Sequence, residues 1–232
     1  PGDNMPGMDI GDYDTTEYYN RTISNPIEPE METRTYYRWG REYTYEEPVT
    51  TTEYFPHGPD GYDDYKSGSV TFERYVHENK TFNDAYLDVD QNALFKNCTF
   101  DGVLYIDCHR SYQGSGYCNN VRFENCTFNG VIVTDTPDEL NWQRNALYFT
   151  GEAAFNNTSD VQEATILAPH FNVNLGNTNP NVGENNELKG AVVGGIVDVR
   201  GNAQIFGTII SMCDTSQWSS GFVTNIGATL DD

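Results

Sequence analysis

The stretch Phe95-Lys96-Asn97-Cys98-Thr99-Phe100-Asp101-Gly102-Val103-Leu104-Tyr105-Ile106-Asp107 decides the fold. It recurs further along the chain as Phe123-Glu124-Asn125-Cys126-Thr127-Phe128-Asn129-Gly130-Val131-Ile132-Val133-Thr134-Asp135, with eight of thirteen positions identical. A supersecondary unit repeated in this way buries its apolar side chains by stacking on the next copy, which predicts a solenoid. We expect the phenylalanines to point inward and to stack on their equivalents. The ladder and core positions of the two copies are Phe95, Asn97, Cys98, Phe100, Phe123, Asn125, Cys126 and Phe128.

The polar residues of the repeat predict turns between short strands. Asn97 and Asn125 follow the first strand of each copy, where their side-chain amides could bond to one another in a ladder. The step from Phe95 to Phe123 is longer than a coil of about 18 to 24 residues. We attribute the excess to a loop between Cys108 and Cys118. A disulfide closing that short loop would imply an oxidising compartment, whereas the alternative is two unrelated thiols at the loop edges.

A second periodic region lies toward the C-terminus. Gly195, Gly201 and Gly207 are evenly spaced, and each begins a hexad with a small or aliphatic residue at its third position. This spacing predicts tight coils in which each hexad supplies one short strand and a glycine corner. The whole chain is therefore expected to be all-β, a right-handed parallel β-helix (solenoid) over residues 67–215, followed by a C-terminal tail over residues 216–232.

Residues 1–66 differ in composition from the rest, being rich in Tyr, Thr, Glu and Pro and poor in aliphatic residues. Such a segment cannot build its own core, so we expect an arm that packs on the solenoid. Residues 33–45 predict a hairpin, because β-forming residues flank the turn pair Trp39-Gly40. Its strands could lay their aromatic faces on the solenoid. The alternative for this arm is a disordered tyrosine-rich linker.

Charge limits the classes of partner. The formal net charge is −22, which argues against nucleic acid, because a phosphate-binding surface must be basic. No apolar run is long enough to span a membrane. The chain begins at Pro1 without a signal peptide, which we interpret as the interior of a longer protein or a trimmed mature form. Acidity and the predicted disulfide together favour an extracellular or cell-surface location.

The repeat Phe-x-Asn-Cys-Thr-Phe-x-Gly resembles coils of right-handed parallel β-helix proteins. The glycine-rich segment 188–210 resembles the solenoid part of bacterial PilX-like pilus-assembly ectodomains, and it is also similar to bactofilin coils. The resemblance covers roughly residues 80–215. It implies a bacterial surface protein whose partners are other cell-surface or pilus subunits, further copies of itself, or carbohydrate. Glycine-rich hexads recur across unrelated solenoids, so the resemblance specifies the fold better than the function.

Two candidate sites carry chemistry. Parallel β-helices often cleave polysaccharides, and Asp107 and Asp135 occupy equivalent repeat positions where stacked carboxylates could split their pKa values for general acid catalysis. The alternative is that both carboxylates sit at strand ends and face solvent. Asp9, Asp12 and Asp14 surround Gly11, and hard oxygen ligands on a flexible turn suit calcium. No other cofactor is expected, and the alternative for this triplet is a solvated acidic tail.

Taken together, these features predict a structural or adhesive surface module rather than an enzyme. A self-assembling extracellular filament subunit is the first alternative, and a polysaccharide-active β-helix enzyme is the second.

Overall fold

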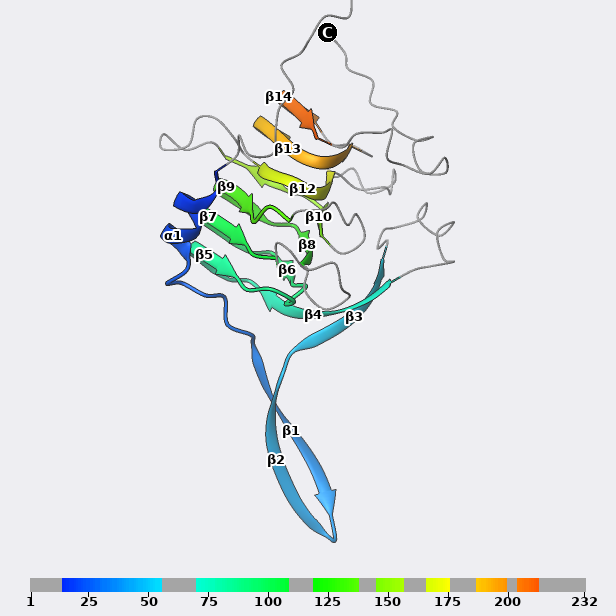
Figure 1. The fold of residues 1–232 in the computed structure, drawn as a ribbon. Helices are drawn as coiled ribbons and strands as arrows, with labels where there is room; N and C mark the ends of the chain where they lie inside the picture. Colours follow the sequence, from blue (N-terminus) through cyan, green and yellow to red (C-terminus); the bar gives the residue numbers. More distant parts are fainter. Residues whose placement is uncertain are drawn as a thin grey trace, which may run out of the picture.

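The structure is a computed structural model, and it describes residues 14–55, 70–108, 119–137, 145–156, 166–175, 187–199 and 204–212. Within these ranges the chain is almost entirely β (Figure 1). The all-β prediction is therefore confirmed. The elements are α1 (Thr16–Thr22), β1 (Met31–Arg38), β2 (Arg41–Pro48), β3 (Thr50–Phe55), β4 (Val70–Glu78), β5 (Thr81–Leu87), β6 (Leu94–Lys96), β7 (Thr99–Ile106), β8 (Asn120–Glu124), β9 (Thr127–Thr134), β10 (Ala146–Thr150), β11 (Ala154–Phe155), β12 (Ile166–Leu175), β13 (Glu187–Val199) and β14 (Gln204–Ser211).

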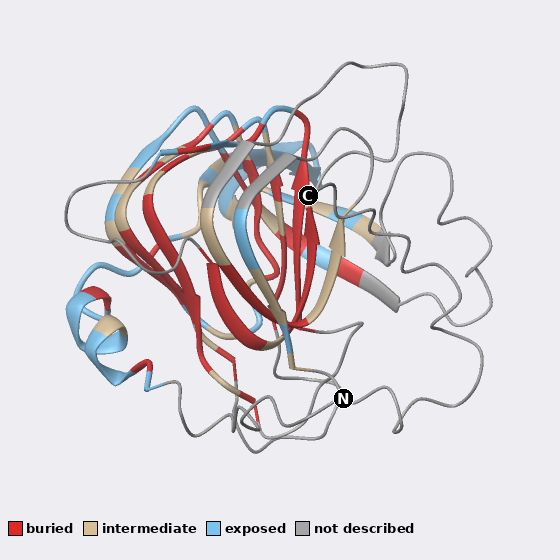
Figure 2. Ribbon diagram, turned by 90° about the horizontal axis from the view of Figure 1, so that it is seen from above, coloured by how far each residue is buried: buried red, intermediate tan, exposed pale blue. Residues whose placement is uncertain are grey.

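Most strands belong to one curled, mixed sheet. Its strand order is β3-β4-β6-β8-β10-β12-β13-β11-β9-β7-β5, with β14 added beside β13. Only the β3–β4 pairing in this sheet is antiparallel, and the other described pairings are parallel. Strands that follow each other in the chain, such as β6 and β7, therefore lie on different parts of the curl. Seen from above, the strands wrap around a buried interior (Figure 2).

The strand register follows the sequence repeat. Thr99 of β7 pairs with Thr127 of β9, its counterpart in the second copy. Thr81 of β5 pairs with Thr99 in turn, across a shorter step of the chain. The longer step contains residues 109–118, where the sequence predicts an inserted loop. Equivalent residues of successive repeats are thus direct neighbours in a parallel ladder, as the repeat predicts.

Phenylalanine rows fill the interior. Phe95, Phe123 and Phe149 stack with ring centroids 5.5 and 5.1 Å apart. A second row, Phe82, Phe100, Phe128 and Phe155, runs beside it with spacings of 5.3, 5.2 and 5.0 Å. The two rows meet edge to face, an arrangement that the ring quadrupoles favour. The predicted inward stacking is therefore confirmed, and Cys98 and Cys126 are buried in the same core.

The predicted asparagine ladder forms at other positions. Asn97 and Asn125 adopt left-handed backbone conformations, with φ of 51° and 54°, which Asn tolerates better than most residues. They turn the chain between β6 and β7 and between β8 and β9. Side-chain ladders occur elsewhere among the described residues. One joins Asn92, Asn119 and Asn145 through backbone N–H donors, and another joins Asp101, Asn129 and Asn156 through side-chain amides.

The predicted hexad coils are wrong. Gly195 lies inside the single strand β13, and Gly207 lies inside β14, so neither forms a corner. Gly207 pairs instead with Gly190 of the neighbouring strand. A Cβ on Gly207 would lie 1.7 Å from the Gly190 carbonyl oxygen. Glycine at this position therefore permits close contact between neighbouring backbones, and Gly201 lies outside the described residues.

The N-terminal arm attaches to the sheet by a helix that composition did not predict. Helix α1 lies against β5 and β7 (Figure 1). Tyr19 of the helix meets Tyr86 and Tyr105 edge to face, with centroids 5.9 and 5.6 Å apart. This contact covers a small apolar cluster on the outer surface of the sheet. The parts of the arm that attach to the sheet are thus α1, the segment after it and β3, which pairs with β4, rather than the hairpin.

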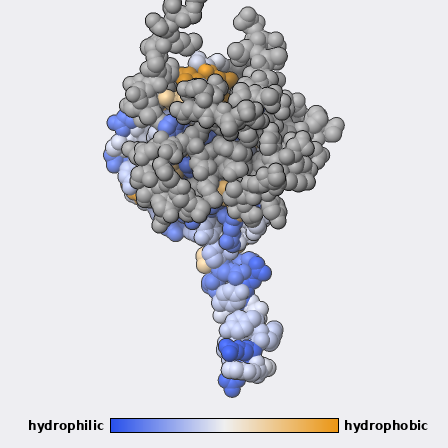
Figure 3. Space-filling model, turned by 45° about the vertical axis from the view of Figure 1, so that its right-hand side comes forward, coloured by the Kyte–Doolittle hydropathy of each residue, from blue (hydrophilic) through white to orange (hydrophobic). Residues whose placement is uncertain are grey.

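The hairpin prediction is confirmed in its pairing and turn. Strands β1 and β2 pair antiparallel from Met31↔Pro48 to Arg38↔Arg41, with Trp39 and Gly40 between them. The hairpin stands clear of the body instead of laying its aromatic faces on the sheet (Figure 3), and its described residues are exposed except near the base. Its strands have polar residues on both faces, so no apolar face exists that would drive it onto the sheet.

Candidate functional site

The most exposed feature of the described structure is the hairpin tip, residues 38–41. Trp39 and Gly40 both have positive φ, 51° and 73°, as the two-residue type I′ turn requires. Asn or Asp is the usual residue before Gly in that turn, whereas a Trp in the left-handed region is strained. Strain of this kind collects at functional positions. The placement of Trp39 therefore marks the tip as a candidate contact site.

Large aromatic side chains are displayed around this tip. Trp39 is 85% exposed and Tyr37 is 72% exposed. The Arg38 guanidinium lies over the Trp39 ring, 4.3 Å from its centroid. Behind the tip, Tyr36 stacks on Tyr43 with centroids 5.3 Å apart. The result is a group of rings held out in solvent, of the residue types that are enriched in binding hot spots.

The tip also carries unpaired positive charge. Among the Arg and Lys side chains that the structure describes, only Arg38 and Arg41 have no ion-pair partner, and they face each other across the turn. The other described cations each pair with a carboxylate: Arg21, Arg34, Arg74, Lys80, Lys96 and Arg122. In a chain with net charge −22, the available cations of the described part are thus concentrated at the end of the hairpin.

Glu30 fixes the base of the hairpin to β4 and to the turn that follows β4. The Val49 N–H donates to the Glu30 carbonyl, which closes the hairpin, and the Val76 N–H donates to the Val49 carbonyl. The Glu30 carboxylate accepts from the Glu78 N–H at 3.1 Å and pairs with Lys80 at 3.0 Å. Burial would raise the pKa of Glu30, but these bonds outweigh it, so that pKa lies below its ordinary value.

His77 lies beneath this base, at the end of a phenylalanine row. Its ring stacks on Phe95 with centroids 5.0 Å apart and is fully buried. Neither ring nitrogen has a hydrogen-bond partner among the described residues, and the Glu30 carboxylate is 4.0 Å from Nδ1. Burial lowers the pKa of His77 to about 4, against the attraction of Glu30. The imidazole is therefore neutral near pH 7 and serves as an aromatic cap.

A second anchor, next to the hairpin base, is a buried ionic cluster around Glu53 of β3. Its two carboxylate oxygens accept from different arginines: Oε2 from Arg74 Nε at 2.7 Å and Oε1 from Arg122 Nη1 at 2.7 Å. Arg122 also pairs with Glu124 at 2.8 Å. The Arg74 side chain is fully buried. Because an unpaired buried cation is very costly, Glu53 holds β3 firmly against β4 and β8.

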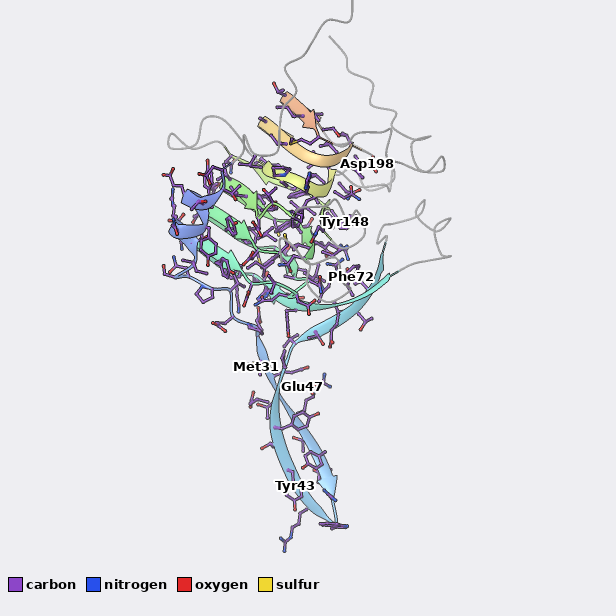
Figure 4. All side chains as sticks on the ribbon, in the orientation of Figure 1. Met31, Tyr43, Glu47, Phe72, Tyr148 and Asp198 are labelled. Carbon is purple, nitrogen blue, oxygen red and sulfur yellow. The ribbon has the colours of Figure 1, made fainter. Side chains whose placement is uncertain are left out.

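The Arg74 guanidinium continues this cluster into the sheet. It donates to the carbonyl and the side-chain oxygen of Asn120 on β8. Burial lowers the pKa of Arg74, although the Glu53 charge opposes the shift. The same surface of the sheet carries Arg122, Tyr148, Asn174 and Asp198 in one register row, and Tyr148 and Asp198 lie along one side of the body above Phe72 (Figure 4). Tyr148 and Asn174 are buried. This row therefore packs between neighbouring strands and offers little exposed surface to a ligand.

The predicted carboxylate pair lies on another part of the curl, after β7 and β9. Asp107 accepts a hydrogen bond from the Tyr86 hydroxyl, and burial, with the nearby Asp135, raises its pKa. Asp135 is only 8% exposed, so it does not face solvent as the alternative interpretation has it. Its Oδ1 accepts from the Thr136 N–H at 2.8 Å, and the Cys108 Sγ lies 3.9 Å from its Oδ2. The carboxylates of Asp107 and Asp135 thus each accept a hydrogen bond from a nearby residue.

The other predicted site residues fall partly outside the described residues. Cys118 does, so the disulfide with Cys108 stays a prediction. Asp9 and Asp12 also do, while Asp14 accepts from the Thr16 N–H at 2.9 Å at the start of α1. Within the described ranges, no group of three or more His, Cys, Asp or Glu side chains is placed to hold a metal ion. The one described helix is too short and too polar to cross a membrane.

Sequence reasoning missed the ionic cluster and the unpaired tip. Arg74 lies between Phe72 and Val76, and residues two apart share one face of a strand. That alternation places a cation on an apolar face, which was the available signal for a buried charge. The lack of an ion pair at Arg38 and Arg41 had no such signal, because it depends on which arginines lie near carboxylates after folding.

Comparison with protein-family models, with curated proteins and with solved structures gave no match to this chain. What the chain does must therefore follow from the residues described above.

Proposed function

We propose that this protein is a structural or adhesive cell-surface module, built as a right-handed parallel β-helix, that contacts its partner through the β1–β2 hairpin. Parallel ladders of equivalent repeat residues and two continuous phenylalanine rows support the β-helix assignment. The glycine-rich segment adds a resemblance to PilX-like pilus-assembly ectodomains, for which an extracellular location is the corresponding proposal.

The observation that carries the functional proposal is the exposed aromatic tip on a rigidly anchored hairpin. Trp39 and Tyr37 are largely in solvent, while Glu30, just before β1, and Glu53, on β3 after the hairpin, fix the flanking segments to the sheet. An isolated two-stranded hairpin is only marginally stable in water. A chain that exposes large rings on such an element gains from a partner that covers them.

The placement of Asp107 and Asp135 favours this function over polysaccharide cleavage. A glycosidase needs one protonated and one ionised carboxylate on either side of the sugar bond, both open to substrate. Asp107 is bonded to Tyr86, and Asp135 is buried against the segment that follows β9. Asp107 and Asp135 therefore have the geometry of residues that end strands and stabilise the turns that follow.

Labelling of intact cells tests the proposal. An antibody raised against the body should label cells of the source organism without permeabilisation, and purified protein should be retained on those cells. Replacing both Tyr37 and Trp39 by Ser should reduce retention at least tenfold, while a Tyr18→Ser variant, altered in α1 and away from the tip, should be retained normally. Labelling only after permeabilisation, or equal retention of the tip variant, would contradict the proposal.

A further inference from the structure

The charges at the hairpin tip specify the chemistry of its partner. Arg38 and Arg41 face each other across the turn, and no carboxylate among the described residues forms an ion pair with either of them. Glu42, the acidic residue nearest the tip, is engaged by the Tyr37 hydroxyl at 2.8 Å. Two guanidinium groups beside exposed rings can form bidentate bonds to carboxylates and stack at the same time. The partner that fits this tip is therefore a surface rich in carboxylates.

Such a surface is available on the protein itself. The chain has 35 acidic residues against 13 basic ones. Most described cations are already in ion pairs, so many of the carboxylates that the structure describes on the body have no described cation paired with them. The exposed carboxylates without an ion pair in the described part include Glu17, Glu28, Asp88 and Glu152. A second copy of the chain thus offers carboxylates that can pair with the two arginines of the tip.

The length of the hairpin explains why the tip does not use its own body. Its strands have eight residues each, which corresponds to a reach of about 26 Å. The Debye length at physiological ionic strength is about 8 Å, so exposed charges further apart are largely screened. The tip lies at the far end of the hairpin from the body (Figures 3 and 4). Its charges are therefore largely screened from those of the body that carries it. The hairpin also allows a tip to reach another body while the two bodies, which repel each other, stay apart.

We propose that the hairpin tip of one molecule docks on the acidic body of a second copy, with Arg38 and Arg41 binding carboxylates and Trp39 covered at the contact. This inference rests on the proposed structural function and names the partner of its contact element. The contact joins two different surfaces, tip and body, so it does not close on itself in a pair. Repetition of a heterologous contact of this kind produces rings or open filaments.

Zero-length crosslinking between isotopically distinct copies tests the contact directly. In an Arg38→Lys/Arg41→Lys variant the tip keeps its charge and gains primary amines, which a carbodiimide joins only to carboxylates in direct contact. Equal amounts of ¹⁴N- and ¹⁵N-labelled variant are mixed and crosslinked. Peptides from residues 31–48 of one isotope should be joined to body peptides of the other. Links within a single isotope only, or no link from the hairpin, would overturn the proposal.

Sedimentation measures the strength of the contact. The unmodified protein should self-associate in proportion to its concentration, and more weakly as salt is raised. An Arg38→Gln/Arg41→Gln variant should associate about tenfold more weakly, since two exposed charge-assisted contacts are lost. The matched control, Arg21→Gln/Lys96→Gln, changes the net charge equally but removes cations that already have partners on the body, and it should associate like the unmodified protein.

The outcomes separate this proposal from the proposed function. If the protein stays monomeric while its retention on cells depends on Arg38 and Arg41, the surface function stands and the proposed contact between copies is overturned. If the protein self-associates through the tip but is found only inside cells, the contact stands and the surface function fails. Equal association of the two double variants would also overturn the contact.

Discussion

Replacing Glu53 by Gln should destabilise the protein more than any other single loss of charge among its described ion pairs. Each Glu53 oxygen accepts from a different arginine, Oε2 from Arg74 and Oε1 from Arg122. A glutamine amide has one oxygen, so one guanidinium would meet an NH₂ group. The fully buried Arg74 would also lose its counter-charge. Breaking a buried pair from one side costs about 3–5 kcal/mol of unfolding free energy.

A matched variant isolates the effect of burial. Glu124 also pairs with Arg122, but its side chain is 32% exposed. Glu124→Gln should therefore cost no more than about 1 kcal/mol, as exposed ion pairs do. Urea unfolding followed by circular dichroism measures both free energies of unfolding. Adding Arg74→Met to Glu53→Gln removes the orphaned cation, so the double variant should be more stable than Glu53→Gln alone. Similar losses for Glu53→Gln and Glu124→Gln, or no rescue by Arg74→Met, would refute the reasoning.

Three further outcomes follow from named contacts. His77, with a pKa of about 4 in the fold against an ordinary 6.5, binds fewer protons than in the unfolded chain between these values. Stability should therefore fall as pH drops through that window, and His77→Phe, which extends the row on Phe95, should remove about 2 kcal/mol of this loss at pH 5 relative to pH 8. Equal pH profiles in urea unfolding would count against it. Gly130→Ala places a Cβ 1.8 Å from the Gly102 carbonyl oxygen and should cost about 2–3 kcal/mol, whereas Gly40→Ala, with open space around it but φ of +73°, should cost about 1 kcal/mol. The reverse order in thermal unfolding would show that close backbone contact is not what requires Gly130. Finally, Trp39→Asn relieves the left-handed strain at the tip and should slow amide hydrogen exchange in residues 31–48 about fivefold, while weakening tip binding. Faster exchange would mean that Trp39 stabilises the hairpin.

The repeat could be predicted from the sequence because one requirement, the direct stacking of equivalent residues, acts on its core positions. Phe95 and Phe123, or Phe100 and Phe128, must match when equivalent residues stack directly on one another, and this identity is visible along the chain. The hairpin was equally local, since a turn pair and its flanking strands lie within a few residues. Local turn chemistry and direct stacking therefore account for most of what could be read from the sequence.

Features that depend on distant partners could not be predicted in the same way. The even glycine spacing near the C-terminus suggested tight coils with a corner at each glycine, yet Gly207 lies within β14 and meets Gly190 of β13. Spacing alone cannot distinguish a corner from a close contact inside a strand. Helix α1 was not predicted because it is stabilised by contacts with Tyr86 and Tyr105, far along the chain, rather than by helix propensity.

The attachment of the hairpin base has a mechanical consequence. A pull applied at Trp39 is carried down both strands and enters the body at Glu30 and Val49, which are bonded to each other and to β4. From there β3 passes the load along its full antiparallel pairing with β4 and, through Glu53, to β8. The tension is thus divided between backbone bonds and a buried ionic joint before it reaches the phenylalanine rows. Because β-strands are already close to full extension, a tether built in this way should pass a pull to these joints with little change in its own length.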